Sequence, residues 1–347
     1  MVREYFLGRP TPDGFKTHIT DEIKSGKYFT YILKGGPGTG KSSLMRTIAK
    51  ESGLEHELYY CSSDPDSLDA IVFTEKKTII VDGTSPHVVE PQYPGVKEKL
   101  VDLGAYWDGN KLLEKADEIV SLSQENTKYH QRAKRCLKAA CAMYQDVETV
   151  SDGGLLRAKL DGFCERLGNH IFKKTKEPKG NIRFKQITSI TPKGVITLRS
   201  AFDGYKVYYI DDRNLAATDH MLKRLSILAI EKGYDCIVSE NPFLEGCRYQ
   251  HLIIPRLGLA FTSGQADMAY ETKINGARFY DKYYLREKRE RIRFGHAAAD
   301  ELINETVLTL KQAKRNHDEL EKPYIDAMDF KGVQKLTDDM IKAIKER

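Results

Sequence analysis

The feature that most constrains the fold of this chain is a glycine-rich segment that directly follows an apolar run. Residues 28–33 (YFTYIL) are β-branched and aromatic, which predicts a buried strand. Residues 35–42 (GGPGTGKS) fit the pattern G-x-x-x-x-G-K-[ST] at every position. Residues 43–50 (SLMRTIAK) have a helical composition. A strand, a glycine loop and a helix in this order predict an α/β fold with a phosphate-binding loop.

The residue types in this loop suit the binding of ATP and Mg²⁺. Glycines let backbone N–H groups turn toward phosphate oxygens, and the following helix adds the positive end of its dipole. We expect Lys41 to reach the β and γ phosphates and the Ser42 hydroxyl to bind the metal. A flexible turn without a ligand would leave these two residues unexplained. The predicted nucleotide contacts are Gly35, Gly36, Pro37, Gly38, Thr39, Gly40, Lys41, Ser42 and Ser43.

A second segment supplies the acid that a magnesium site needs. Residues 78–81 (TIIV) are β-branched or apolar, and Asp82 follows them, as in the Walker-B pattern. Residues 57–61 (ELYYC) predict the strand that lies between this segment and the loop in sequence. We therefore predict Ser42 and Asp82 as the metal ligands, and Lys41 and Asp82 as catalytic residues.

The position after Asp82 departs from many hydrolysing P-loop proteins, which carry a glutamate there to orient the attacking water. This chain has Gly83. His87, a residue type that can change its charge near neutral pH, and Glu90 are predicted as catalytic replacements, and Asp64 is a further candidate. Each of them could instead bond only within its own loop, so these alternatives stay open.

The chain also repeats itself. Residues 11–15 (TPDGF) recur as residues 191–195 (TPKGV), and the difference in residue number is 191 − 11 = 180. Residues 131–135 (QRAKR) resemble residues 311–315 (KQAKR) at the same offset, where Tyr144 matches Tyr324. Several matches in order indicate two homologous halves.

The repeat predicts two tandem domains, residues 1–173 and 182–347, joined by a polar linker at 174–181. The expected fold class is α/β, with two P-loop NTPase-type three-layer α/β/α domains, mainly parallel sheets and helical extensions. Pro323 is expected to interrupt the helical extension of the second half.

The second half lacks the phosphate chemistry, so we predict a degenerate domain without a nucleotide site. At an offset of 177, Lys41 becomes Thr218 and Ser42 becomes Asp219, and the loop glycines are absent. Thr262 aligns with the position of Asp82. Such a domain could still supply an arginine finger to the first half, although surface ion pairs are the more common role of an arginine. The candidates are Arg213, Arg248 and Arg256.

Composition narrows the function class. The 55 basic and 50 acidic residues give a net charge of +5, too small for a dedicated nucleic-acid binder. The spacing of the six cysteines does not match a metal site, and no apolar run is long enough to span a membrane, which predicts a soluble cytoplasmic protein.

In residues 280–293 (YDKYYLREKRERIR), basic residues alternate with tyrosines, a composition that could bind a nucleic acid. However, Glu287 and Arg291 are spaced i,i+4, as an ion pair on a solvated helix would be, so we favour a solvated helix over a nucleic-acid site.

Together, these segments resemble a little-characterised bacterial family of tandem P-loop ATPase-like proteins. The resemblance rests on GGPGTGKS, IIVDGTSPHVVEP, Tyr93-Pro94-Gly95, Tyr106-Trp107-Asp108 and the later residues 251–255 (HLIIP), and covers nearly the whole chain. Members are described as ATP-binding proteins or ATPases, often with phosphate loops in both halves. This chain departs from them in its second half.

The sequence therefore predicts an ATP-binding, Mg²⁺-dependent ATPase, a hydrolase that acts as a nucleotide-driven switch between two homologous halves. ATP is favoured over GTP because no N/T-K-x-D string that would read guanine is present. Two alternatives remain: a kinase for a nucleoside or metabolite, and a nucleotide-sensing scaffold with little turnover. The protein partner or small-molecule acceptor is not identified by the sequence.

Overall fold

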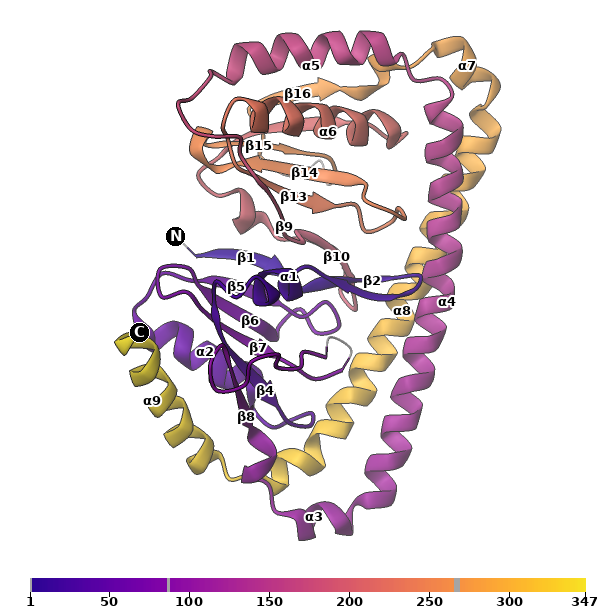
Figure 1. Ribbon diagram of the computed structural model, residues 1–347. Helices are drawn as coiled ribbons and strands as arrows, with labels where there is room; N and C mark the ends of the chain where they lie inside the picture. The colour runs from indigo at the N-terminus through magenta and orange to yellow at the C-terminus, as the bar shows by residue number, and fades with distance from the viewer. Residues whose placement is uncertain (1, 86–87, 265–268) are drawn as a thin grey trace. The chain divides into compact units, whose positions relative to one another are not determined.

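A computed structural model describes residues 2–85, 88–264 and 269–347 of the chain (Figure 1). The chain forms two compact units. Unit 1 comprises Met1–Lys134, Ser189–Ile196 and Thr306–Arg347, and unit 2 comprises Arg135–Thr188 and Thr197–Glu305. Each unit contains a six-stranded mixed sheet with helices, and most strands in each sheet are parallel. The predicted α/β class with mainly parallel sheets is therefore confirmed.

The sheet of unit 1 has the strand order β1-β5-β6-β7-β4-β8. Pairing is parallel throughout except at β6, which is antiparallel to both of its neighbours. The predicted strands at 28–33, 57–61 and 78–82 are confirmed to within a residue at each end. The bounds are β1 Arg3–Phe6, β4 Phe29–Lys34, β5 Glu57–Tyr60, β6 Leu68–Phe73, β7 Thr78–Asp82 and β8 Glu98–Asp102.

Two helices, α2 (Lys41–Ser52) and α9 (Phe330–Glu346), pack on one face of this sheet. Leu44 and Ile48 of α2 and Met340 and Ile344 of α9 are buried in one apolar cluster with strand residues such as Ile71. Burial of this kind, at about 25 cal/mol per Å² of apolar surface, is the main force that holds the helices to the sheet. The remaining elements of unit 1 are α1 Ile19–Lys24, α3 Gly109–Glu114, the 3₁₀ helix η1 Leu103–Tyr106 and the strands β2 Gly8–Thr11 and β3 Gly14–Thr17.

The sheet of unit 2 repeats the same order and the same directions. Its strands run β9-β13-β14-β15-β12-β16, with only β14 antiparallel to its neighbours. Read in chain order, each strand corresponds to one strand of unit 1. The bounds are β9 Ile182–Phe184, β12 Lys206–Asp211, β13 Cys236–Glu240, β14 Tyr249–Ile254, β15 Leu259–Thr262 and β16 Thr272–Asn275.

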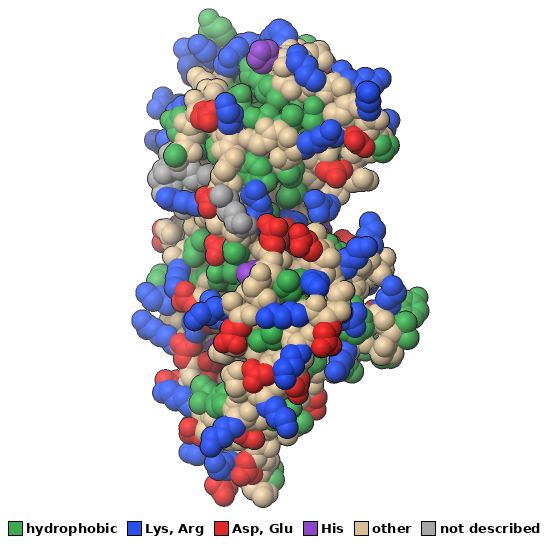
Figure 2. All heavy atoms as spheres, turned by 90° about the vertical axis from the view of Figure 1, so that its left-hand side faces the viewer, with side chains coloured by type: hydrophobic (Ala, Val, Ile, Leu, Met, Phe, Trp, Pro, Cys, Tyr) green, Lys and Arg blue, Asp and Glu red, His purple; other side chains and the backbone are tan. Residues whose placement is uncertain are grey.

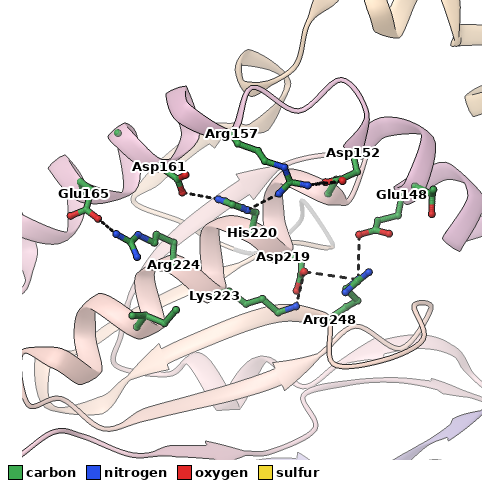
Figure 3. A pocket seen from close by; sticks show the side chains of 14 residues that line it. Glu148, Asp152, Arg157, Asp161, Glu165, Asp219, His220, Lys223, Arg224 and Arg248 are labelled. Carbon is green, nitrogen blue, oxygen red and sulfur yellow. Dashed lines mark hydrogen bonds and ion pairs between the residues drawn. The ribbon is translucent and has the colours of Figure 1, made fainter.

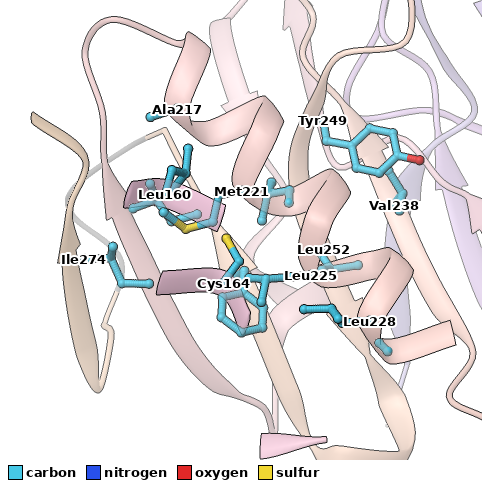
Figure 4. Close-up of a cluster of buried hydrophobic side chains, with 14 of the residues drawn as sticks. Leu160, Cys164, Ala217, Met221, Leu225, Leu228, Val238, Tyr249, Leu252 and Ile274 are labelled. Atoms are coloured by element: carbon cyan, nitrogen blue, oxygen red, sulfur yellow. The ribbon is translucent and has the colours of Figure 1, made fainter. Parts of the chain in front are cut away.

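In unit 2, α6 (Ala216–Glu231) and α5 (Arg157–Ile171) pack with the sheet in one apolar cluster. Figure 4 shows Leu160 and Cys164 of α5 against Met221 and Leu225 of α6, in the same cluster as Leu252 of β14. The remaining elements of unit 2 are α7 Lys282–Glu287 and the 3₁₀ helices η2 Arg199–Phe202, η3 Pro255–Leu257 and η4 Gly276–Phe279. The paired strands β10 Thr188–Thr191 and β11 Gly194–Thr197 belong to unit 1 except for Thr188 and Thr197.

Two long helices, α4 (Ala116–Asp152) and α8 (Arg289–Ala327), contribute residues to both units. As a result, each predicted segment, 1–173 and 182–347, supplies part of both units: α5 belongs to unit 2 and α9 to unit 1. The expected interruption at Pro323 is wrong, because α8 continues through this residue to Ala327. A proline removes one backbone hydrogen bond, a loss that the last turns of a long, packed helix can tolerate.

The helices also correct the offset of the repeat in the helical extensions. The starting positions of α4 and α8 differ by 289 − 116 = 173, and those of α5 and α9 differ by the same amount, 330 − 157 = 173. The sequence match of residues 131–135 with 311–315, at an offset of 180, is therefore one heptad out of step. Amphipathic helices repeat their pattern about every seven residues, so a slip of two turns preserves the similarity.

In the part of the chain that the structure describes, no helix combines the length and the apolar character needed to cross a membrane. Lys and Arg side chains are interspersed with Asp and Glu over the face shown in Figure 2. The six cysteines are free thiols.

Candidate phosphate site in unit 1

The glycine loop between β4 and α2 holds its backbone amides ready for an anion. Gly38 and Gly40 have φ angles of +69° and +84°, which favour glycine. Among the residues that the structure describes, no protein acceptor receives a hydrogen bond from the amides of Gly36, Gly38, Thr39 or Gly40. Gly40 is the N-terminal cap of α2 and offers no side chain to that helix end. The donors and the helix dipole therefore suit a phosphate group.

Lys41 is folded back over this loop. Its Nζ donates hydrogen bonds of 2.9 Å to the carbonyl oxygens of both Gly35 and Gly36. The same atom lies 3.7 Å from Oδ2 of Asp82, and both side chains are only 12% exposed. The structure thus brings together the predicted lysine, the loop and the predicted acid.

Asp82 is held in place at the end of β7. Its Oδ1 accepts hydrogen bonds from the Thr84 amide at 2.9 Å and from the Thr84 hydroxyl at 2.6 Å. These bonds turn the other carboxylate oxygen toward Lys41. A fixed carboxylate of this kind suits a hard divalent cation such as Mg²⁺.

The hydroxyls of the loop have different partners. Ser42 Oγ accepts a hydrogen bond of 2.9 Å from the Leu68 amide, at the start of β6, and keeps a second lone pair for a metal. Thr39 is buried and donates to the Gly36 carbonyl at 2.8 Å, which stiffens the loop. Ser43 is exposed in the first turn of α2.

A further acid, Asp69, joins this group and was missed from the sequence. Asp69 lies on β6 at an irregularity of the β5–β6 pairing, and Asp69 and Asp82 are the residues that follow the last β6–β7 pair, Ala70 with Val81. Burial, followed by the negative charge of Asp82, raises the pKa of Asp69 to about 8. The available signal is a single acid at the start of an otherwise apolar run, residues 68–73 (LDAIVF).

The outer side of the loop is covered by the last turns of α8 and the start of α9. A Cβ added to Gly36 would lie 2.9 Å from the Tyr324 ring, and one added to Gly38 would lie 2.7 Å from the Glu321 carbonyl oxygen. A Cβ at Gly40 would meet the ring of Phe330 at 3.4 Å. Close helix packing is therefore a second reason for these glycines, in addition to phosphate binding.

The single tryptophan of the chain lies next to this cover. The rings of Trp107 and Tyr324 have centroids 5.9 Å apart. The backbone of the same segment pairs with the end of α8: Asp108 donates to the Ala327 carbonyl at 2.8 Å, and Asp329 donates to the Tyr106 carbonyl at 2.7 Å. Residues 106–108, on which the family resemblance partly rests, therefore have a structural role: they attach to the end of α8 beside the phosphate loop.

The three candidates for a water-orienting residue have separate outcomes. Glu90 accepts a hydrogen bond of 2.6 Å from Lys34, which also donates to the Gly83 carbonyl, so Glu90 is engaged in an ion pair. Asp64 accepts from the Ser67 hydroxyl at 2.7 Å and lies 3.4 Å from Lys314 of α8. His87 lies outside the described residues, and its predicted role is not tested.

The residues of unit 2 that correspond to Ser42 and Asp82 can be identified by comparing equivalent strands of the two sheets. The first amide of β14, from Tyr249, donates to Asp219 Oδ1 at 2.8 Å, as the Leu68 amide donates to Ser42. Asp219 therefore takes the place of Ser42, as the offset of 177 predicts. Asp82 pairs with the fifth residue of β4, whereas Thr262 pairs with only the fourth residue of β12. The counterpart of Asp82 is thus Ser263, one residue after the predicted Thr262.

The helix start of unit 2 has its own internal anion. The buried carboxylate of Asp212 accepts hydrogen bonds from the Asn214 amide at 3.0 Å and the Thr218 amide at 2.9 Å. The Tyr280 hydroxyl donates to the same carboxylate at 3.0 Å and accepts from the Ala217 amide at 2.7 Å. The amides at this helix start, those of Ala217 and Thr218, are therefore occupied by protein groups.

Unit 2 also contains a cavity of about 780 Å³ bounded by the end of α4, α5 and α6 (Figure 3). Each Lys and Arg side chain of its lining is paired with an acidic side chain, so it offers no surplus positive charge to a phosphate. The pairs are Arg157 with Asp152, His220 with Asp161, Lys223 with Asp219, Arg224 with Glu165 and Arg248 with Glu148.

Several basic residues singled out from the sequence form ion pairs within unit 2. Arg248 pairs with Glu148, and Arg256 lies 3.9 Å from Glu177. In the segment 280–293, Arg291 bonds to Asp146 rather than forming the expected pair with Glu287. Whether an arginine of unit 2 acts on a nucleotide stays a hypothesis.

Comparisons with protein-family models, with curated proteins and with solved structures found no match for this chain. The family resemblance drawn from the sequence therefore stays a prediction.

Proposed function

We propose that unit 1 binds ATP with Mg²⁺ at residues 35–43 and hydrolyses it, as a P-loop ATPase. One observation carries the proposal: Lys41 lies against the Gly35 and Gly36 carbonyls and beside Asp82, at a loop whose amides have no protein acceptor among the described residues. These donors, one ammonium, one hydroxyl and one fixed carboxylate fit a triphosphate and a hard metal ion.

Each residue has a role in this proposal. The loop amides bind phosphate oxygens, and Lys41 leaves the carbonyls to offset negative charge on the terminal phosphate. Ser42 and Asp82 would hold Mg²⁺, and Thr84 keeps Asp82 oriented. When bound, Mg²⁺ would supply positive charge that offsets the negative charge of the phosphate groups.

The proposed switch between the two halves rests on α8. Its last turns contact the phosphate loop at Gly36 and Gly38, and its first turns belong to unit 2. Phosphate bound in the loop would therefore act on a helix that both units share. The partner that responds is not identified.

Binding can be followed through Trp107, because its ring contacts Tyr324, which covers Gly36. We expect Mg-ATP to change the Trp107 fluorescence saturably and to be followed by release of inorganic phosphate. Lys41→Ala should weaken binding at least about 100-fold, since it removes a charge-assisted contact. Lys50→Ala removes an exposed lysine of the same helix and should change nothing.

The outcomes separate the alternatives. Binding and turnover that both fall in Lys41→Ala support the ATPase. Tight binding without phosphate release in the wild-type chain supports the nucleotide-sensing scaffold, and phosphate transfer to an added nucleoside or metabolite supports a kinase. No binding by the wild-type chain would contradict the proposal.

A further inference from the structure

We propose that Asp69 is the carboxylate that orients the attacking water and accepts its proton, the role for which Gly83 has no side chain. This proposal rests on the proposed ATPase function. It assigns the missing catalytic group to a strand that lies outside both recognised motifs.

The direction of β6 places Asp69 at the correct edge of the sheet. Ligands of open α/β sheets bind outside the carboxyl ends of the parallel strands. β6 runs antiparallel to β5 and β7, so its first residues, not its last, reach that edge. Asp69 is the second residue of β6, and its neighbour Leu68 donates to Ser42 of the phosphate loop.

The register places Asp69 beside the proposed metal ligand. The last pair of the β6–β7 ladder is Ala70 with Val81, so Asp69 and Asp82 are the next residue of each strand beyond it. Asp69 is also the extra residue at an irregularity of the β5–β6 pairing, where Tyr59 pairs with Ala70 and Tyr60 with Leu68, and such irregularities often re-aim a side chain next to a site. Asp82 in turn contacts Lys41. A water bound at the terminal phosphate would thus meet a second acid, only 5% exposed, on the Asp82 side of the site.

Unit 2 supports this assignment. There the corresponding register pairs His251 with Thr262, so the next pair is Gln250 with Ser263, and the Ser263 amide donates to the Gln250 carbonyl at 3.1 Å. Both acids are therefore replaced by neutral residues in the unit that also lacks the lysine. A carboxylate needed only for the fold would have no reason to disappear together with the phosphate chemistry.

The proposed step is a direct displacement. The water oxygen forms a bond to the γ-phosphorus, and the bond from that phosphorus to the β–γ bridging oxygen breaks, with its electron pair retained by ADP. The proton lost by the water passes to Asp69, which accepts it only in its ionised form, and then to solvent. The products are ADP and inorganic phosphate.

The test compares ATP binding with single-turnover hydrolysis in Asp69→Asn, which keeps the size of the side chain. We expect the hydrolysis rate to fall at least about 100-fold while the dissociation constant for Mg-ATP stays within about threefold. Asp69→Glu should recover part of the rate, which a purely structural role would not predict. Asp66→Asn, an exposed acid of the preceding loop, is the control and should hydrolyse normally.

Hydrolysis by Asp69→Asn within a few-fold of the wild-type rate, with intact ATP binding, would overturn the role of Asp69 and leave the proposed ATPase standing. Loss of ATP binding in the same variant would assign Asp69 to the fold or to metal binding, and would also overturn it. A wild-type chain that binds no ATP would instead overturn the proposed function itself.

Discussion

Units 1 and 2 have the same strand order and directions, yet their helix starts carry opposite chemistry. In unit 1 the amides before α2 have no protein acceptor among the described residues, and a lysine lies beside an acid. In unit 2 the start of α6 is occupied by the Asp212 carboxylate and the Tyr280 hydroxyl. The comparison shows that the sheet does not itself require a phosphate ligand, because protein groups accept the hydrogen bonds of the amides at the helix start of unit 2.

The largest expected effect is on Mg-ATP affinity, and it compares Asp82, the last residue of β7, with Ser263, the residue directly after β15. Asp82→Asn should abolish the ability of Mg²⁺ to tighten ATP binding, weakening Mg-ATP about 100-fold, because it removes a metal-binding charge. Ser263→Ala, at the matching place in unit 2, should leave affinity within twofold. Trp107 fluorescence with and without a chelator measures both. Equal effects in the two variants would mean that the units do not differ as described.

The next effect tests the internal anion of unit 2. Asp212→Ala should lower the free energy of unfolding by about 2.5 kcal/mol, since two amides and the Tyr280 hydroxyl lose a buried acceptor. Asp212→Asn keeps one carbonyl oxygen and should cost less. Urea unfolding followed by circular dichroism measures the change. An unchanged midpoint in the alanine variant would refute the role given to this carboxylate.

A smaller effect tests the helix cover of unit 1. Gly38→Ala should cost about 2 kcal/mol, partly from its positive φ and partly from the 2.7 Å approach to the Glu321 carbonyl. Gly53 has nearly the same φ, +68°, with no heavy atom within 4 Å of an added Cβ, so Gly53→Ala isolates the cost of the backbone conformation at about 1 kcal/mol. Thermal unfolding compares them. Equal costs would show that α8 does not constrain the loop.

The effect with the smallest change per step, at most about 1.4 kcal/mol per pH unit, is a pH dependence that arises in unit 2. His251 corresponds to Ala70 of unit 1, and its ring bonds to Thr188 and Thr262 at 2.8 and 2.7 Å. Burial lowers its pKa from 6.5 to about 3. Below pH 6.5 the unfolded chain therefore binds a proton that the folded chain does not, and this term lowers stability by at most about 1.4 kcal/mol per pH unit as pH falls toward 3.

The measurement is urea unfolding between pH 7 and 4.5, compared with His251→Gln, which cannot titrate. The wild-type chain should lose stability more steeply than the variant over this range. Parallel curves would contradict the assignment of a neutral, buried histidine.

The elements with strong local signals were predictable. The strand before the loop, the strand that ends in Asp82 and the loop itself follow from short-range patterns, and the structure places Lys41 and Asp82 together. Pro323 was misjudged because its local effect on a helix is outweighed by packing in α8. The offset of the long helices was misjudged because a heptad pattern matches itself after a slip of one full repeat.

The non-local features were beyond reach from the sequence. Nothing in residues 330–346 indicates that α9 packs on α2, because α2 lies near the opposite end of the chain in sequence. Asp69 was missed because its importance depends on β6 entering the sheet antiparallel between β5 and β7. Pairing of this kind is set by the whole sheet rather than by the residues of the one strand.

The central claim is that one chain carries one nucleotide site, in unit 1. Isothermal titration calorimetry with Mg-ATP, or with a non-hydrolysable analogue, measures the number of sites directly. We predict one site per chain, lost in Lys41→Ala and retained in Thr218→Ala, the variant at the matching place in unit 2. Two sites per chain, or a single site that survives Lys41→Ala, would contradict the account.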